Sequence, residues 1–517
     1  MVQKVAVIGA GPCGLSSVKA CLDEGLEPTC FESSDDIGGL WRYKEKLVPG
    51  RTNIYQCVII NSSKEMMAFS DFPPPAELPN SMHHTEVLLY LRLYAQTFSL
   101  LQHIHLQTKV VGLRQRPDFD ATGQWDVETE TADGRRQTHV FDAVMVCTGH
   151  YTQPHLPLSS FPGIESFKGR YFHSWEYRNA KGLEGKRVVV IGFGNCGCDI
   201  AVDISRVAER VYLSTRSGAW VVGRVGPGGL PFDTTWISRL VVTLSSLKLN
   251  EFVDHKLYGL KPKHNFWAQI PVINDDLPGR IISGRIQVKP NVKEFRETSV
   301  VFTDRSIIDE VDVVVFATGY NYSFPFLPPD LQAKSGYRLR LYKHVIPPTL
   351  AHPTLAVVGF IHGLGAINSM AEMQARWSTR VFKGLISLPA EDVMVKEIET
   401  ETVDVIPYTD SLAEQVGAKP NILQLLFTEP ALVLQVVLGP YTSYQYRLSG
   451  PGKWAGARQA IFAQKQRIAR PFRTRAVSEE PGNEASSKLS ILLAFITGAA
   501  LLFLALLCQK YIFKKMY

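Results

Sequence analysis

The sequence predicts an α/β protein with two doubly wound parallel sheets and a C-terminal transmembrane helix. Two glycine-rich turns, at residues 9–14 and 192–197, each follow a short apolar run and lead into a helix-like stretch. Two apolar runs ending in Thr-Gly, at 142–149 and 312–319, repeat in the same order. Residues 489–508 carry no charge. Because strand, glycine turn and helix in this order are typical of dinucleotide binding, we expect two Rossmann-like domains.

Length and composition set the broad class. A chain of 517 residues is too long for one core, and 45% hydrophobic with 20% charged residues is typical of globular proteins. The net charge of +6 is mild and no basic cluster alternates with aromatic residues, so nucleic acid is not an expected partner. Eight scattered cysteines indicate reduced thiols, and a chain that starts directly with a strand predicts no signal peptide.

The first glycine turn predicts a pyrophosphate site. Gly9 allows the tight turn, Gly11 lets a pyrophosphate approach the backbone, and Gly14 lets helix and strand pack closely. Glu32 ends the next strand 18 residues after Gly14, where an acid holds ribose hydroxyls; a solvated strand end is the alternative. An apolar strand at 355–359 predicts that residues after about 330 complete this domain. The candidate residues here are Gly9, Ala10, Gly11, Pro12, Cys13, Gly14 and Glu32.

The second turn predicts a different nucleotide. The strand at 211–213 ends in Ser-Thr-Arg with no acid, and a hydroxyl with a guanidinium suits a 2′-phosphate, which favours NADPH over NADH. Arg224 is expected to join this clamp, with a surface arginine as the alternative. The close pair Cys196 and Cys198 is interpreted as small packing residues rather than a redox dithiol. The candidates are Gly192, Gly194, Asn195, Cys196, Gly197, Cys198, Asp199, Thr215, Arg216, Arg224, Thr318 and Gly319.

The C-terminal apolar segment predicts a membrane anchor. As a helix, its 20 residues extend about 30 Å, the thickness of a bilayer core. The expected organisation is a dinucleotide-binding domain at 1–155, a second one at 156–330 with an insertion at about 217–297, the second part of the first at 331–445, an extension and linker at 446–488, and a transmembrane helix at 489–508.

No nucleophile–histidine–acid triad and no metal-ligand cluster is evident, so no metal is expected. Redox chemistry by a bound flavin needs neither, because the protein then supplies position, electrostatics and water exclusion.

Four further motifs carry a family resemblance. Residues 167–177, 316–320, 37–41 and 61–67 resemble the signatures of the flavin-containing monooxygenases, and the resemblance runs from residue 1 to the anchor. It implies an FAD site in the first domain, an NADPH site in the second, and Asn61 as the catalytic residue beside the flavin. It also implies localisation in the endoplasmic reticulum membrane. The residues it adds to the cofactor sites are Gly39, Leu40, Trp41, Ile60, Asn61 and Ser62.

The resemblance implies a catalytic cycle. NADPH reduces FAD, reduced flavin and O2 form a C4a-hydroperoxyflavin, and the nitrogen or sulfur of a small xenobiotic or metabolite takes up the distal oxygen. Baeyer–Villiger oxygenation of ketones and largely uncoupled NADPH oxidation stay open as alternatives. A flavin disulfide reductase is disfavoured because residues 38–47 contain no cysteine, and a nucleotide sensor without chemistry is disfavoured by the intact motifs. The sequence leaves open whether the chain forms a homo-oligomer.

Overall fold

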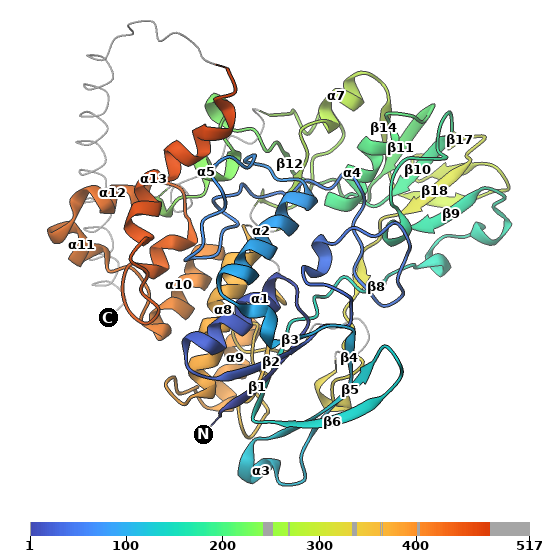
Figure 1. The fold of residues 1–517 in the computed structure, drawn as a ribbon. Helices are drawn as coiled ribbons and strands as arrows, with labels where there is room; N and C mark the ends of the chain where they lie inside the picture. Colours follow the sequence, from blue (N-terminus) through green and yellow to red (C-terminus); the bar gives the residue numbers. More distant parts are fainter. Residues whose placement is uncertain are drawn as a thin grey trace, which may run out of the picture. The chain divides into compact units, whose positions relative to one another are not determined.

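The computed structural model describes residues 2–240, 252–266, 269–332, 339–361, 363, 365–400 and 404–475. The chain forms two compact units, Met1–Pro471 and Phe472–Tyr517, and all elements below belong to the first. Figure 1 shows two separate parallel sheets within that unit, as the repeated motifs predict.

The first sheet contains five parallel strands in the order β20-β7-β1-β2-β3. Its central strand, β1, is completely buried over Val5, Ala6 and Val7, as expected for a parallel sheet covered on both faces. β20 lies beyond residue 330 and pairs with β7, so the expected late strand does join this sheet. The strands are β1 Lys4–Ile8, β2 Glu27–Phe31, β3 Ile104–His105, β7 Ala143–Val146 and β20 Leu355–Val357.

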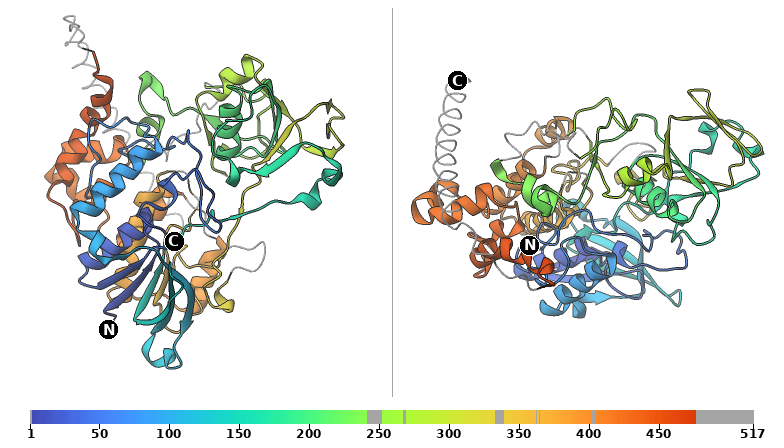
Figure 2. Two further views of the ribbon diagram at one scale, coloured as in Figure 1. Left: turned by 45° about the vertical axis from the view of Figure 1, so that its right-hand side comes forward. Right: turned by 90° about the horizontal axis from the view of Figure 1, so that it is seen from above.

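Helices from both ends of the first unit cover this sheet. α8 packs along α1, and α10 packs against α8, so the C-terminal half of the unit lies beside its N-terminal turn (Figures 1 and 2). The apolar side chains beneath them, including Leu15 and Met370, form one buried core. The helices are α1 Pro12–Asp23, α2 His84–Thr97, α8 Ile367–Phe382, α9 Glu391–Thr400, α10 Val405–Val416, α11 Ile422–Thr428, α12 Pro430–Leu438 and α13 Ala457–Ala469.

The second sheet repeats the plan in the order β14-β11-β10-β18-β9, again with every pair parallel. Its core, which includes Val188, Val190 and Val315, is separate from the first. The two cores explain how one chain carries two dinucleotide-type sheets. The elements are β9 Arg170–His173, β10 Arg187–Ile191, α4 Asn195–Ile204, β11 Arg210–Ser214, β12 Val221–Val222, α5 Phe232–Trp236, β13 Val272–Ile273, α7 Leu277–Ile282, β14 Ile286–Lys289 and β18 Val313–Phe316.

Each Thr-Gly strand is preceded by a three-stranded antiparallel meander. Directly after the Thr-Gly ends, β8 pairs with β19, which brings the two crossings between the sheets side by side. The remaining elements are α3 Phe119–Thr122, β4 Thr108–Gln115, β5 Trp125–Thr131, β6 Arg136–Phe141, β8 Gln153–Pro154, β15 Val292–Phe295, β16 Val300–Phe302, β17 Ile307–Ile308 and β19 Tyr320–Asn321.

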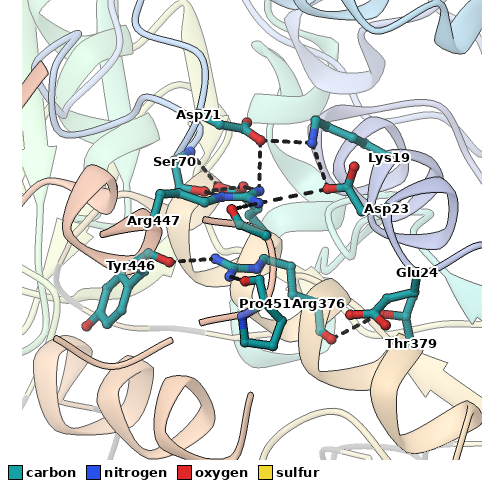
Figure 3. A network of polar contacts seen from close by, with 12 residues as sticks. Lys19, Asp23, Glu24, Ser70, Asp71, Arg376, Thr379, Tyr446, Arg447 and Pro451 are labelled. Carbon is teal, nitrogen blue, oxygen red and sulfur yellow. Dashed lines mark hydrogen bonds and ion pairs between the residues drawn. The ribbon is translucent and has the colours of Figure 1, made fainter. Parts of the chain in front are cut away.

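A buried ionic cluster ties the segment after α12 to the first sheet's helices (Figure 3). The Arg447 side chain is 3% exposed and pairs with Glu372 at 2.9 Å and Asp71 at 3.0 Å. Lys19 of α1 pairs with Asp71 at 2.8 Å. Arg376 of α8 donates to the carbonyl of Tyr446 at 3.2 Å. The cluster therefore ties α1 and α8 to the short 3-10 helix at Ser443–Arg447.

The predicted linker at 476–488 and membrane helix at 489–508 lie outside the described residues. Within the described part of the chain, none of the helices has the length and apolar character that crossing a bilayer requires.

Candidate active site

The first glycine turn has the geometry of a pyrophosphate cradle. Gly9 has a φ of +101°, and a Cβ there would lie 2.8 Å from the carbonyl oxygen of Cys147. A Cβ on Gly14 would lie 1.8 Å from the carbonyl oxygen of Gly9. Only glycine fits at either position, so α1 starts hard against β1 and its N-terminal N–H groups face the turn.

The Glu32 carboxylate fixes the backbone of this turn. Its carboxylate accepts hydrogen bonds from the backbone N–H of Ala10 and of Ser34, both at 2.8 Å, and the residue is 6% exposed. Oε1 also accepts from the Ser33 hydroxyl at 3.4 Å, whereas Oε2 has Ala10 as its one partner among the described residues and keeps a lone pair for a ribose hydroxyl. The Gly38 N–H donates to the carbonyl of Ala10 at 2.9 Å and places Gly39, Leu40 and Trp41 in a short 3-10 helix across the turn.

The second turn has the same construction. Gly192 has a φ of +112°, and a Cβ there would lie 2.3 Å from the carbonyl oxygen of Ala317. A Cβ on Gly197 would lie 2.2 Å from the carbonyl oxygen of Gly192. At Gly194, the N-cap of α4, a Cβ would meet nothing within 4 Å. The N-terminus of α4 is therefore open on the side where an anion binds.

One cavity of about 1430 Å³ collects half of the residues predicted for the second nucleotide. The second turn, the strand end at β11 and the Thr-Gly end of β18 all line it, and so does the segment 404–406 of the first domain. Its size exceeds that of a typical ligand pocket, about 300–1,000 Å³, so it has room for a dinucleotide and a substrate. The predicted residues lining it are Gly192, Gly194, Thr215, Arg216, Thr318 and Gly319.

Two predicted residues of α4 face elsewhere. Asn195 accepts a hydrogen bond from the N–H of Ile273 at 2.8 Å. Asp199 accepts from the Tyr55 hydroxyl at 2.7 Å and from the Asn274 amide at 2.8 Å, while burial raises its pKa. These contacts hold the insertion and the first domain against α4. The buried Cys198 thiol also has its pKa raised by burial, which suits the packing interpretation.

Arg224, which the sequence predicts in the phosphate clamp, is not among the residues that line this cavity with Thr215 and Arg216. The chain passes through β12 after Arg216 and carries Arg224 to the segment at 59–61. There Arg224 Nη2 donates to Asn61 Oδ1 at 2.9 Å, and the side chain is 12% exposed. Its partners are therefore in the first domain rather than at the end of β11.

The backbone near Asn61 contacts a buried carboxylate that the sequence did not indicate. Asp233 of α5 accepts a hydrogen bond from the N–H of Ser63 at 2.6 Å. Among the described residues its other oxygen, Oδ1, is buried without a hydrogen-bond partner, and burial raises its pKa to about 6. A lone acid in a Gly/Pro-rich stretch, 170 residues from its partner, gives no sequence signal.

The segment around Asn61 is also held from the C-terminal side. Glu65 pairs with Arg467 of α13 at 2.9 Å and accepts from the Tyr444 hydroxyl at 2.9 Å. The Lys64 ammonium is buried and donates to the carbonyl of Leu78 at 2.7 Å. These contacts fix the backbone at residues 64 and 65, close to Asn61 in the chain, and a rigid backbone helps to hold a catalytic group in place.

His173 orders the crossing between the two sheets. Its Nε2 donates to the carbonyl oxygen of Gly319 at 3.0 Å, and its Nδ1 accepts from the N–H of Trp175 at 3.0 Å. Burial lowers its pKa to about 4, so the ring is neutral at neutral pH. Both bonds need that neutral tautomer, which suits an ordering role.

Comparison with known proteins decides the family. The family described as flavin-binding monooxygenase-like matches this chain over residues 2–510. The chain belongs to that family. It is 50% identical to flavin-containing monooxygenase 5 of Rattus norvegicus, over 97% of this chain and 99% of the relative. It is 47% identical to dimethylaniline monooxygenase [N-oxide-forming] 2 of Macaca mulatta, over 98% and 99% of the two chains.

Solved structures agree with the fold. S-allyl-L-cysteine S-oxygenase from Allium sativum superposes with a TM-score of 0.64 at 25% identity, covering 90% of this chain and 98% of that one. The open structure of cyclohexanone monooxygenase superposes with a TM-score of 0.54 at 18% identity, covering 92% and 100%. As a member of the family, the chain is a flavin-dependent oxidoreductase that works with FAD and NADPH.

Proposed function

We propose that this flavin-containing monooxygenase transfers one atom of O2 to the nitrogen or sulfur of a small nucleophilic substrate, while NADPH is oxidised and the second atom leaves as water. The observation that carries the proposal is the pair of intact dinucleotide cradles in one compact unit. Bound flavin supplies hydride acceptance and O2 activation, chemistry that needs no acid–base pair from the chain.

We assign the cofactor-binding and catalytic roles to different residues of the chain. The turns at 9–14 and 192–197 hold the two pyrophosphates, Glu32 holds the ribose of FAD, and Thr215 with Arg216 holds the 2′-phosphate of NADPH. Asn61 is the proposed catalytic residue, because its carboxamide offers a donor that does not titrate. Both domains contribute walls to the cavity, and we expect bound cofactors to complete a site from which water is excluded.

The test is product analysis with isotopically labelled O2. The purified protein is given NADPH together with a thioether, a tertiary amine or a ketone. Label in a sulfoxide or N-oxide supports the proposal. An ester from the ketone alone points to ketone oxygenation, and H2O2 without any labelled product points to an oxidase.

We further propose that residues 489–508 anchor the enzyme in the endoplasmic reticulum membrane as a transmembrane helix. The support is the uncharged length of 20 residues. The full chain should remain with microsomal membranes after an alkaline wash, whereas a chain that stops at Arg475 should be released. Light scattering of the detergent-solubilised enzyme decides whether it is a homo-oligomer.

A further inference from the structure

The amide of Asn61 has two ends, and one of them is already occupied. Its Oδ1 accepts a hydrogen bond from Arg224 Nη2 at 2.9 Å. Among the described residues, no protein group accepts a hydrogen bond from its Nδ2. A guanidinium carries donors only, so a flipped amide would set donor against donor.

Arg224 is itself held from three directions. Its Nε donates to the carbonyl of Ile60 at 3.2 Å, which fixes the guanidinium against the same segment as Asn61. Asp275 Oδ2 lies 3.3 Å from Arg224 Nη1, and Asp275 Oδ1 accepts from the Arg224 backbone N–H at 2.7 Å. A Cβ on Gly223 would lie 2.9 Å from that Oδ1, so the glycine permits this close approach.

The anchor connects in turn to the second glycine turn. Asn274, next to Asp275, donates to Asp199 of α4 at 2.8 Å. Ile273 donates to Asn195, the first residue of α4, at 2.8 Å. The helix that opens the predicted NADPH site therefore sets the position of Asp275, and Asp275 sets the position of Arg224.

We propose that Arg224, anchored by Asp275, is a positioning residue that fixes the Asn61 carboxamide with its NH2 group directed away from the guanidinium and available to the reacting partners. The proposal rests on the proposed function, since it concerns the same site. It replaces a phosphate-binding role for Arg224, because a guanidinium committed to Asn61, Ile60 and Asp275 lies away from the end of β11.

The test compares Arg224→Met with Arg216→Met, a cavity-lining arginine. Product formed per NADPH consumed should fall about tenfold in Arg224→Met, the size expected for one lost hydrogen bond from a charged donor. The difference is released as H2O2, while the KM for NADPH and the preference over NADH stay as in the parent. Arg216→Met should keep the coupling of the parent but raise the KM for NADPH and weaken the preference over NADH. A changed NADPH preference with unchanged coupling in Arg224→Met overturns the proposal.

Further measurements separate positioning from loss of fold and from failure of the proposed function. Without NADPH, amide hydrogen exchange over residues 59–63 should rise in Arg224→Met while FAD content is retained. Combined with Asn61→Asp, Arg224→Met should add no further loss of coupling, since both act through one amide; additive losses contradict the proposal.

Arg224→Lys, which keeps the charge but not the planar guanidinium, should recover part of the coupling. A parent enzyme that forms no oxygenated product refutes the proposed function instead.

Discussion

At the scale of single residues, the site depends on donors and acceptors that have one permitted arrangement. Glu32 is fixed by the N–H groups of Ala10 and Ser34, Asn61 by Arg224, and His173 by Gly319 and Trp175. For Glu32 and Asn61, a backbone group or a guanidinium decides which polar atom remains for a ligand, whereas both ring nitrogens of His173 are occupied. Chemistry in this fold therefore relies on orientation more than on proton transfer by side chains.

Asn61→Asp tests the donor directly. A carboxylate keeps the pairing with Arg224 but lacks the NH2 group, so the side chain stays in place while its donor is lost. We expect FAD content like that of the parent and a larger share of NADPH ending as H2O2. The measurement is product and H2O2 per NADPH. Oxygenation as efficient as in the parent shows that the amide is not the functional group.

Asp233→Asn tests the buried carboxylate through pH. Its pKa is about 6 in the folded chain against an ordinary value of 3.8, so the folded form retains the proton longer as pH rises. Between these values the parent loses stability with rising pH, and the full cost applies above about pH 6. The variant should melt higher than the parent above that pH, and this advantage should vanish in acid. Asp120→Asn, at an exposed position, is the control. A difference in Tm that does not change with pH contradicts this account.

The sequence predicted single residues well wherever a local pattern fixes them. The two turns, Glu32 and the Thr215–Arg216 pair are read from neighbours in the chain, and the structure places the turns and strand ends as expected. Arg224 and Asp233 were misplaced or missed because their partners lie 163 and 170 residues away. Such contacts depend on how the insertion folds back over the first domain, and no local spacing records that.

At the scale of elements, the two strand–turn–helix units obey the same packing rule. Gly14 and Gly197 sit where a Cβ would collide with the carbonyl of the turn's first glycine, whereas Gly194 has open space around it. Two glycines of one motif therefore have different reasons to be glycine. Gly197 lets the helix pack closely against the strand, and Gly194 leaves space for the nucleotide.

A matched pair of alanine variants separates these reasons. Gly197→Ala should lower Tm and reduce the yield of folded protein, because a Cβ 2.2 Å from the Gly192 oxygen forces helix and strand apart. Gly194→Ala should leave Tm unchanged and raise the KM for NADPH, because its Cβ would meet only a bound pyrophosphate. Thermal melting and NADPH titration check both. If Gly194→Ala binds NADPH as the parent does, the pyrophosphate does not lie over this turn.

At the scale of the molecule, the first domain is assembled from distant parts of the chain. β20 and α8 close a sheet that β1 opens, and the residues after α12 are tied back to α1 through the cluster in Figure 3. The apolar run at 355–359 made this return predictable from sequence. The ion pairs that secure it were not predictable, since charged residues scattered over four segments show no pattern.

Replacing the central arginine of that cluster tests how much the cluster contributes to the stability of the domain. Arg447→Met leaves Glu372 buried without its cation and Asp71 paired with Lys19 alone, and we expect a loss of about 3–5 kcal/mol in the free energy of unfolding. The control is Lys168→Met, which breaks an exposed pair with Glu297 and should change stability little. Thermal and denaturant unfolding measure both. Equal small effects mean that the cluster does not secure the domain.

We propose that two dinucleotides meet inside one compact unit so that hydride passes between them. Mixing the purified enzyme with NADPH in the absence of O2 tests it most directly, with the visible absorbance of the flavin as the signal. We expect NADPH to bleach the flavin completely and NADH to do so much more slowly. A flavin that stays oxidised while NADPH binds would contradict it.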